Sequence, residues 1–154
     1  MYRSCGLYVT LGFLLSMPAV GASPGVKTEL IGGTLPDIVA RSAARLDYSG
    51  GDEMVFHCTA GDIRVPYQKV NTLEYGQTVS RRYAAAVFIS PLLLLSKARK
   101  HFVTLGYVDS EGHQQVVVFR VEKGDIRSVL VGLEARTGRR VEYQDDEARK
   151  AGKG

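Results

Sequence analysis

The sequence predicts a mainly β domain, a small antiparallel barrel or bent sheet of about six or seven strands capped by one C-terminal amphipathic helix. Short apolar runs of about five residues alternate with turns rich in Gly and Asp along most of the chain. Within several runs, apolar and polar residues alternate, as in strands with one buried face. Near the C-terminus the apolar spacing changes to that of a helix.

The size and charge of the chain limit what it can be. It has 154 residues, which suits one compact domain, and 45% of them are hydrophobic, enough for a packed core. The formal net charge of +4 is compatible with an acidic partner such as lipid head groups. No basic stripe interleaved with aromatic residues accompanies that charge. We therefore expect no nucleic-acid partner.

Residues 1–22 are expected to be a secretory signal peptide. Arg3 precedes an apolar run from about Leu7 to Met17, and small residues end at Ala22. That run is shorter than the roughly twenty residues of a membrane-spanning helix, which favours a cleaved leader over an uncleaved anchor. The sequence thus predicts an exported protein, periplasmic or extracellular, with peripheral membrane contact as an option.

After cleavage of the expected signal peptide, the exported chain would contain one cysteine. Cleavage removes Cys5, and Cys58 then has no partner for an internal disulfide. Cys58 lies in a strand-like run, MVFHC, where a free cysteine most often acts as a small buried hydrophobe. We expect it in the core.

The domain is expected to cover residues 23–143, mostly as strands. Residues 38–45 are the exception, where a helical turn is possible. Gly112 suits the left-handed position of the hairpin loop that joins the two clearest strands. Pro66 is expected to close its strand, because it has no N–H to donate. The expected strands are residues 27–33, 44–48, 54–58, 63–65, 70–77, 101–108 and 114–121, with a short edge strand at 141–143.

Residues 124–137 are expected to form the C-terminal helix. Asp125 is placed to cap its start, Arg136 lies in its last turn, and Gly138 suits the left-handed end. Residues 144–154 are expected to be a disordered polar tail. The apolar residues that share one helical face are Ile126, Val129, Leu130 and Leu133.

This order of elements resembles the pleckstrin-homology-like superfold, including its bacterial and GRAM-type relatives. The stretch IRVPYQKVNTLEYG, the hairpin DSEGHQQVVVFRV and the terminal helix carry the resemblance, which covers roughly Leu30 to Gly138. The resemblance implies a barrel that binds lipids, proteins or peptides, and the sequence as a whole resembles an exported bacterial protein. Many eukaryotic members bind phosphoinositides through a basic motif in the first strand pair. That region here offers Lys27, Arg41 and Arg45 at irregular spacing, so we transfer no head-group site.

The sequence predicts no catalytic, cofactor or metal residues, and hence a protein that is not an enzyme. His57, His101 and His113 are far apart in the chain. The spacings CxxC, HExxH and GxSxG are absent from it. Neighbouring carboxylates lie in a turn and in the tail, where solvation is the ordinary state.

Residues 80–100 are expected to be an apolar helical insert. Thirteen residues without charge, Tyr83–Leu95, lie between basic flanks. As one helix they cover about 20 Å, too short for a hydrocarbon core of roughly 30 Å. Ser90-Pro91 suits the start of a second short helix. The stretch could be packed core, contact an anionic membrane, or bind a protein partner or second copy.

We therefore expect an exported binding module that associates peripherally with a membrane through residues 83–95 and their basic flanks. The alternative is a soluble protein-interaction or oligomerisation domain that uses the same surface. The expected contact residues are Arg81, Arg82, Phe88, Ile89, Leu92, Leu93, Leu94, Leu95, Lys97, Arg99 and Lys100.

Overall fold

The computed structural model describes residues 25–36, 38–79 and 100–153. The expected signal peptide (1–22) and residues 80–99 of the expected insert lie outside these ranges, so both remain predictions. In chain order the elements are β1 (Val26–Gly33), β2 (Ser42–Asp47), β3 (Glu53–Cys58), β4 (Gly61–Pro66), the 3-10 turn η1 (Tyr67–Lys69), β5 (Val70–Gly76), β6 (His101–Val108), β7 (Gln114–Val121), α3 (Ile126–Thr137), β8 (Glu142–Tyr143) and α4 (Asp146–Lys153).

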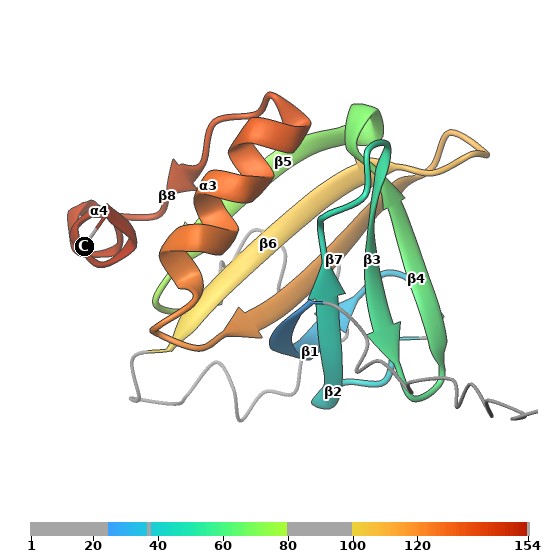
Figure 1. Cartoon of the computed structure of the whole chain (residues 1–154), viewed down its shortest axis with the longest axis horizontal. Coiled ribbons are helices and arrows are strands. Elements are labelled where there is room, and N and C mark those ends of the chain that lie inside the picture. The colour runs from blue at the N-terminus through green and yellow to red at the C-terminus, as the bar shows by residue number, and fades with distance from the viewer. Residues whose placement is uncertain (1–24, 37, 80–99, 154) are drawn as a thin grey trace, which may run out of the picture.

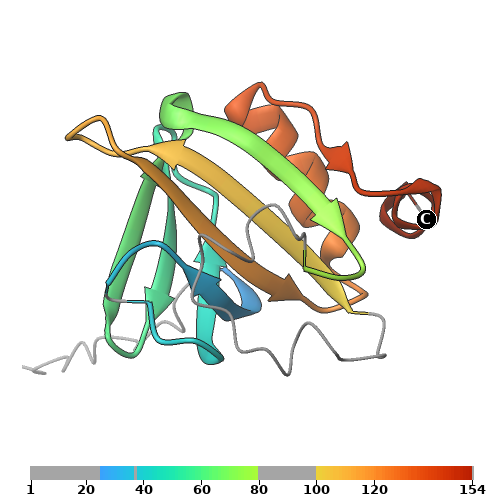
Figure 2. The ribbon, with the colours of Figure 1, turned by 180° about the vertical axis from the view of Figure 1, so that it is seen from behind.

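The described strands form one curled, mixed sheet, a half-barrel, with two helices at the C-terminal end. The strand order is β4-β3-β2-β1-β7-β6-β5-β8. All neighbours are antiparallel except β8, which runs parallel to β5. Helix α3 lies across the inner side of the curl (Figure 1), and the view from behind shows the outer side of β5, β6 and β7 (Figure 2).

Strand β1 joins the two halves of the sheet, because it pairs with β2 on one side and β7 on the other. Its register with β7 shifts between Leu30 and Gly32. Such a bulge bends the strand and increases its twist, which helps a single sheet to curl. The mainly β prediction is confirmed, although the sheet has eight strands rather than six or seven.

The inner side of the curl holds the main core. Phe56 of β3 and Phe119 of β7 are fully buried and meet edge to face, with ring centroids 5.1 Å apart. The four apolar residues expected on one face of the C-terminal helix are all buried in α3. Gly138 ends that helix at φ 66°, in the left-handed conformation expected.

Three local expectations need correction. Residues 42–45 are the start of β2 rather than helical, and Arg41, at φ 64°, turns the chain into it. Asp125 precedes α3 but its side chain makes no capping hydrogen bond; its backbone carbonyl accepts from Val129 instead. Residues 146–153 form helix α4 where we expected a disordered tail.

Helix α4 begins at an N-cap residue, although the polar composition of the segment is typical of a disordered tail. The Asp145 carboxylate accepts the Ala148 N–H at 2.6 Å, an N-cap contact. Asp146 and Glu147 occupy the first turn, where negative charge favours a helix. Ala148 is fully buried, so one apolar side chain anchors an otherwise polar helix.

Candidate functional site

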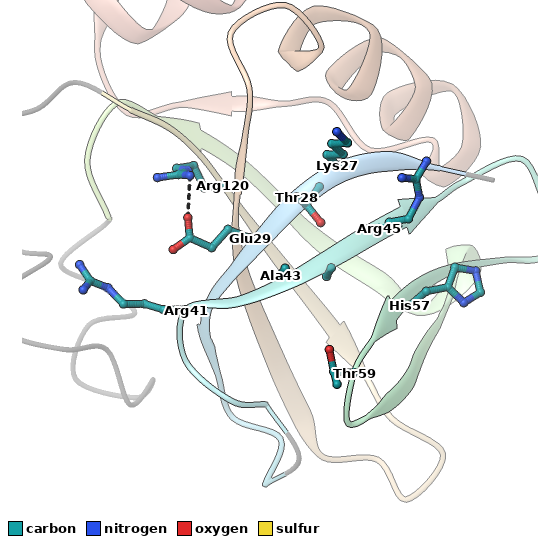
Figure 3. Close-up of a pocket in the computed structure, with 10 residues that line it drawn as sticks. Lys27, Thr28, Glu29, Arg41, Ala43, Arg45, His57, Thr59 and Arg120 are labelled. Carbon is teal, nitrogen blue, oxygen red and sulfur yellow. Dashed lines mark ion pairs between the residues drawn. The ribbon is translucent and has the colours of Figure 1, made fainter. Parts of the chain in front are cut away.

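A cationic groove lies on the outer side of β1, β2 and β3, where alternation along the strands turns charged residues outward. In β1, Leu30 faces the core while Lys27 and Glu29 face out; in β2, Leu46 faces the core while Arg45 faces out. Five side chains define what we call the cationic groove: Lys27, Arg41, Arg45, His57 and Arg120, with Glu29 among them. Figure 3 shows these residues around the exposed strands.

The register of the strands brings three basic side chains into one row. Lys27 of β1 is directly opposite Arg45 of β2, and Arg45 is directly opposite His57 of β3. Directly opposed side chains have Cβ atoms about 5 Å apart, and like charges in such pairs destabilise a sheet. This row therefore concentrates positive charge at a cost to stability.

Small residues hollow the surface between the charged side chains. Ala43 is flanked by Glu29 on β1, and Thr59 lies just beyond the end of β3. Both line a pocket of about 490 Å³, within the range of small-molecule sites. Four cationic side chains against the carboxylate of Glu29 give the lining a formal charge of +3 with His57 neutral.

Part of this charge is already paired. The Arg120 guanidinium lies 2.7 Å from the Glu29 carboxylate, the ion pair drawn in Figure 3. His57 Nδ1 lies 2.9 Å from Asp62 Oδ1, beyond the edge of the groove. Both contacts leave the centre of the groove, between Lys27 and Arg45, without a carboxylate.

Arg45 is held in place yet keeps an unused donor. Its Nη2 donates to the Gly25 carbonyl at 2.9 Å, which fixes the guanidinium against β1. Its Nε–H is buried and has no hydrogen-bond partner among the described residues. The Thr28 hydroxyl, in the strand between Lys27 and Glu29, is also buried without one. A buried donor without an acceptor costs about 1–3 kcal/mol, which an anionic ligand could recover at Arg45.

The positive surface continues along β7. Arg120 lines both the groove and a smaller pocket of about 330 Å³, whose lining adds Lys100 and Lys123. Lys100 is one of the contact residues expected from the sequence, and the structure places it beside the groove. The other ten, Arg81, Arg82, Phe88, Ile89, Leu92–Leu95, Lys97 and Arg99, lie outside the described residues.

A pocket of about 540 Å³ lies between α3, the start of β1 and the end of β2, and it is slightly larger. Its carboxylate, Asp47, accepts hydrogen bonds from the Ser49 N–H and hydroxyl. Its one cation, Arg136, donates to the carbonyls of Ser49 and Gly50 and lies 6.0 Å from the Tyr67 ring centroid. These contacts fix α3 to the loop before β3. We therefore infer that this pocket is a packing boundary between α3 and strands β1 and β2, not a ligand site.

The remaining reactive groups have structural contacts. The Cys58 thiol is half-buried and donates to the Phe56 carbonyl at 3.4 Å, and burial raises its pKa, so it stays protonated at neutral pH. Among the described residues, no three His, Cys, Asp or Glu side chains gather as metal ligands would. In that same part of the chain, no helix is long and apolar enough to cross a membrane.

His101 lies beside the smaller pocket and makes the stability of the protein depend on pH. Its Nδ1 is 2.6 Å from the Tyr75 hydroxyl, and the two rings stack at 6.0 Å. Burial, with the nearby Lys123 charge, lowers the pKa of His101 below its ordinary value of about 6.5. Between the two pKa values the unfolded chain binds more protons, so stability is full above about pH 6.5 and falls as pH drops toward the folded-state pKa.

We expect urea unfolding to show this loss between pH 7.5 and pH 5. His101→Gln removes the titrating ring but keeps a side chain that can hydrogen bond to Tyr75, so it should flatten the dependence. Gln68→Ala, which changes an exposed side chain that does not titrate, serves as the control and should leave the pH dependence unchanged. An equally steep loss in His101→Gln would contradict the assignment.

Sequence reasoning missed the cationic groove. The sequence offers Lys27, Arg41 and Arg45 at a spacing that follows no motif, and their neighbours His57 and Arg120 come from β3 and β7. The usable signal was alternation, which puts Lys27, Arg45 and His57 on the polar faces of their strands. No protein-family model and no curated protein sequence matches this chain.

Proposed function

We propose that this chain is an exported, non-enzymatic binding module that holds an anionic ligand in the cationic groove. One observation carries the proposal. Lys27 and Arg45 stand directly opposite each other, and neither has a carboxylate partner among the described residues. A ligand that brings negative charge between them would turn a repulsive pair into two attractive contacts.

The chemistry of the groove favours a phosphate or a similar compact oxyanion. A guanidinium offers planar paired donors that match phosphate and carboxylate oxygens, and a lysine ammonium adds a point charge. A pocket of about 490 Å³ suits a head group rather than a long polymer. The continuation to Lys100 and Lys123 would accommodate a second anionic group of the same ligand.

The fold is compatible with this role. Strands β1–β4 and strands β5–β7 form two antiparallel meanders joined by the β1–β7 pairing, and a helix covers the inner side, which supports the proposed pleckstrin-homology-like barrel. That frame is a binding frame in many proteins, although fold alone does not fix function. The proposal rests on the groove itself.

Two sources of the same anion chemistry must be separated: a phosphorylated lipid head group and a free phosphate compound. Equilibrium titration with inorganic phosphate and pyrophosphate tests the free ligands. Flotation with neutral phosphatidylcholine vesicles, and with vesicles that also contain phosphatidylglycerol, tests the membrane source. Both should be run at about 50 and 300 mM salt, because raising the salt screens exposed charges more strongly.

Arg45→Ala should weaken binding about 10- to 100-fold, the worth of one or two charge-assisted hydrogen bonds. Arg127→Ala removes the same charge from the exposed face of α3 and should have no effect. If neither probe binds, or if the two variants behave alike, the groove is not the site. If flotation persists in Arg45→Ala while pyrophosphate binding is lost, the membrane contact lies elsewhere, as the basic-flanked apolar segment predicts.

A further inference from the structure

The outer side of the sheet carries a second apolar cluster beside the cationic groove. It belongs to the strand faces opposite the main core, because Val116 and Val118 alternate in β7 with the core residues Val117 and Phe119. We call this set the back face. Its members and their exposed fractions are Ile31 (1%), Val79 (5%), Phe102 (5%), Val116 (5%) and Val118 (0%).

Polar neighbours on the same side are buried as well. Thr104 of β6 is directly opposite Val118 and is 2% exposed, and Glu74 of β5 is 5% exposed. A buried patch that extends from β1 across β7 and β6 to β5 is a covered surface. It is unlike the cationic groove on β1–β3, where Lys27, Arg41 and Ala43 are exposed.

The described helices do not cover the centre of this face. Two described residues reach its margins: Gln144 donates to the Glu74 carboxylate, and the Thr34 hydroxyl accepts the Val116 N–H. Helix α3 packs on the opposite side of the sheet, against the main core (Figures 1 and 2). Helix α4 contacts α3, β5 and β8, at the far edge of the sheet. Within the described residues, Val79 is the one member of the back face that comes from outside the strands.

The residues on either side of 80–99 indicate which part of the chain covers the back face. Val79 leads into residues 80–99 and is part of the back face, while Phe102 follows them and is part of it too. The Lys100 N–H donates to the Gln77 carbonyl at 3.4 Å, so the segment leaves the sheet and returns at one place. Twenty residues that go out and back as two arms could reach about 30 Å if extended, and about 15 Å if helical. The distance from β5 to β1 across three strand spacings is about 14 Å.

We propose that residues 80–99 dock on the back face and form a second core layer of the domain. The composition of the segment suits an apolar surface such as the back face. Thirteen residues without charge, Tyr83–Leu95, lie between basic flanks that can remain in water. The two sides of the sheet are then buried by different parts of the chain. The leucines at 92–95 face protein, and the anion site remains the exposed part of the outer side.

Disulfide trapping tests this directly. In a background without native thiols (Cys5→Ser, Cys58→Ser), Val118→Cys is combined in turn with Leu92→Cys, Leu93→Cys, Leu94→Cys and Leu95→Cys. At least one pair should form an intramolecular disulfide in the folded monomer, seen by mass spectrometry after size-exclusion chromatography. Ser128→Cys on the exposed face of α3, combined with the same four, is the control and should form none. If Val118→Cys does not fold, Val116→Cys replaces it.

Three results would overturn the docking proposal. A disulfide-linked dimer would assign the back face to a second copy of the chain. A Val118→Cys thiol that reacts as fast as an exposed one would show an open face. Thiols at 92–95 that become protected only when anionic vesicles are added would assign the segment to a membrane. None of these results depends on whether the cationic groove binds an anion.

Discussion

Phe56→Ala is expected to lower the free energy of unfolding by about 3–5 kcal/mol, the usual range for removing a fully buried phenyl ring. Phe56 is completely buried and meets Phe119 edge to face at 5.1 Å. The two rings come from β3 and β7, on either side of the β1–β2 pair in the curled sheet. Losing one therefore loosens the contact that holds the curl closed, as well as leaving a cavity.

Urea unfolding at pH 7.5 measures this loss. Val55→Ala is the matched control, because Val55 is the next residue in β3, is only half-buried and points to the other side. It should cost about 1 kcal/mol or less. A Phe56→Ala variant as stable as the control would mean that the sheet does not close around this ring pair.

Arg45→Glu is expected to abolish anion binding while leaving the protein as stable as the wild type or slightly more stable. The change removes a cation and places a carboxylate opposite Lys27, which then has an attractive partner. Opposite charges in directly opposed positions contribute roughly 0.2–1 kcal/mol to a sheet. The loss in affinity should exceed that of Arg45→Ala and reach more than about 100-fold.

A change that harms binding without harming stability is the signature of a residue kept for function. Pyrophosphate titration and urea unfolding should be measured on the same sample. Arg127→Glu reverses an equal charge on α3 and should bind pyrophosphate like the wild type. If Arg45→Glu instead unfolds the domain, Arg45 is a structural residue; if it still binds, the ligand lies elsewhere.

Most of the fold could be predicted from the sequence because the strands alternate cleanly. Val103, Leu105 and Tyr107 face the core opposite β7, and Val117, Phe119 and Val121 face it from that strand, as expected. The β2 strand was harder, since SAAR contains helix-forming alanines. Pairing of Ala44 between Thr28 and Cys58 overrides that local preference.

The cationic groove could not be predicted, because it depends on register. Lys27 and Arg120 are far apart in the chain, and only the β1–β7 pairing brings Arg120 against Glu29. A one-residue slip in any strand would turn its charged residue to the other face. One hint was present: Arg120 is the one charged residue in the otherwise apolar end of QQVVVFRV.

The position of the apolar segment, residues 80–99, also could not be predicted from the sequence. Its composition alone leaves core, membrane and partner open, since each of them can bury leucine. The back face adds what composition lacks, a buried apolar surface at which the segment begins and ends. That surface shifts the preferred interpretation from membrane contact toward core.

A ¹⁵N-resolved NMR titration of the protein with pyrophosphate tests directly whether the cationic groove binds an anion. Ligand binding in the cationic groove predicts saturable shifts of amide signals confined to residues 27–29, 41–45, 57–59 and 120, with weaker effects at 100 and 123. Saturable shifts that instead cluster at α3, or no shifts at millimolar pyrophosphate and low salt, would show that the cationic groove is not an anion site.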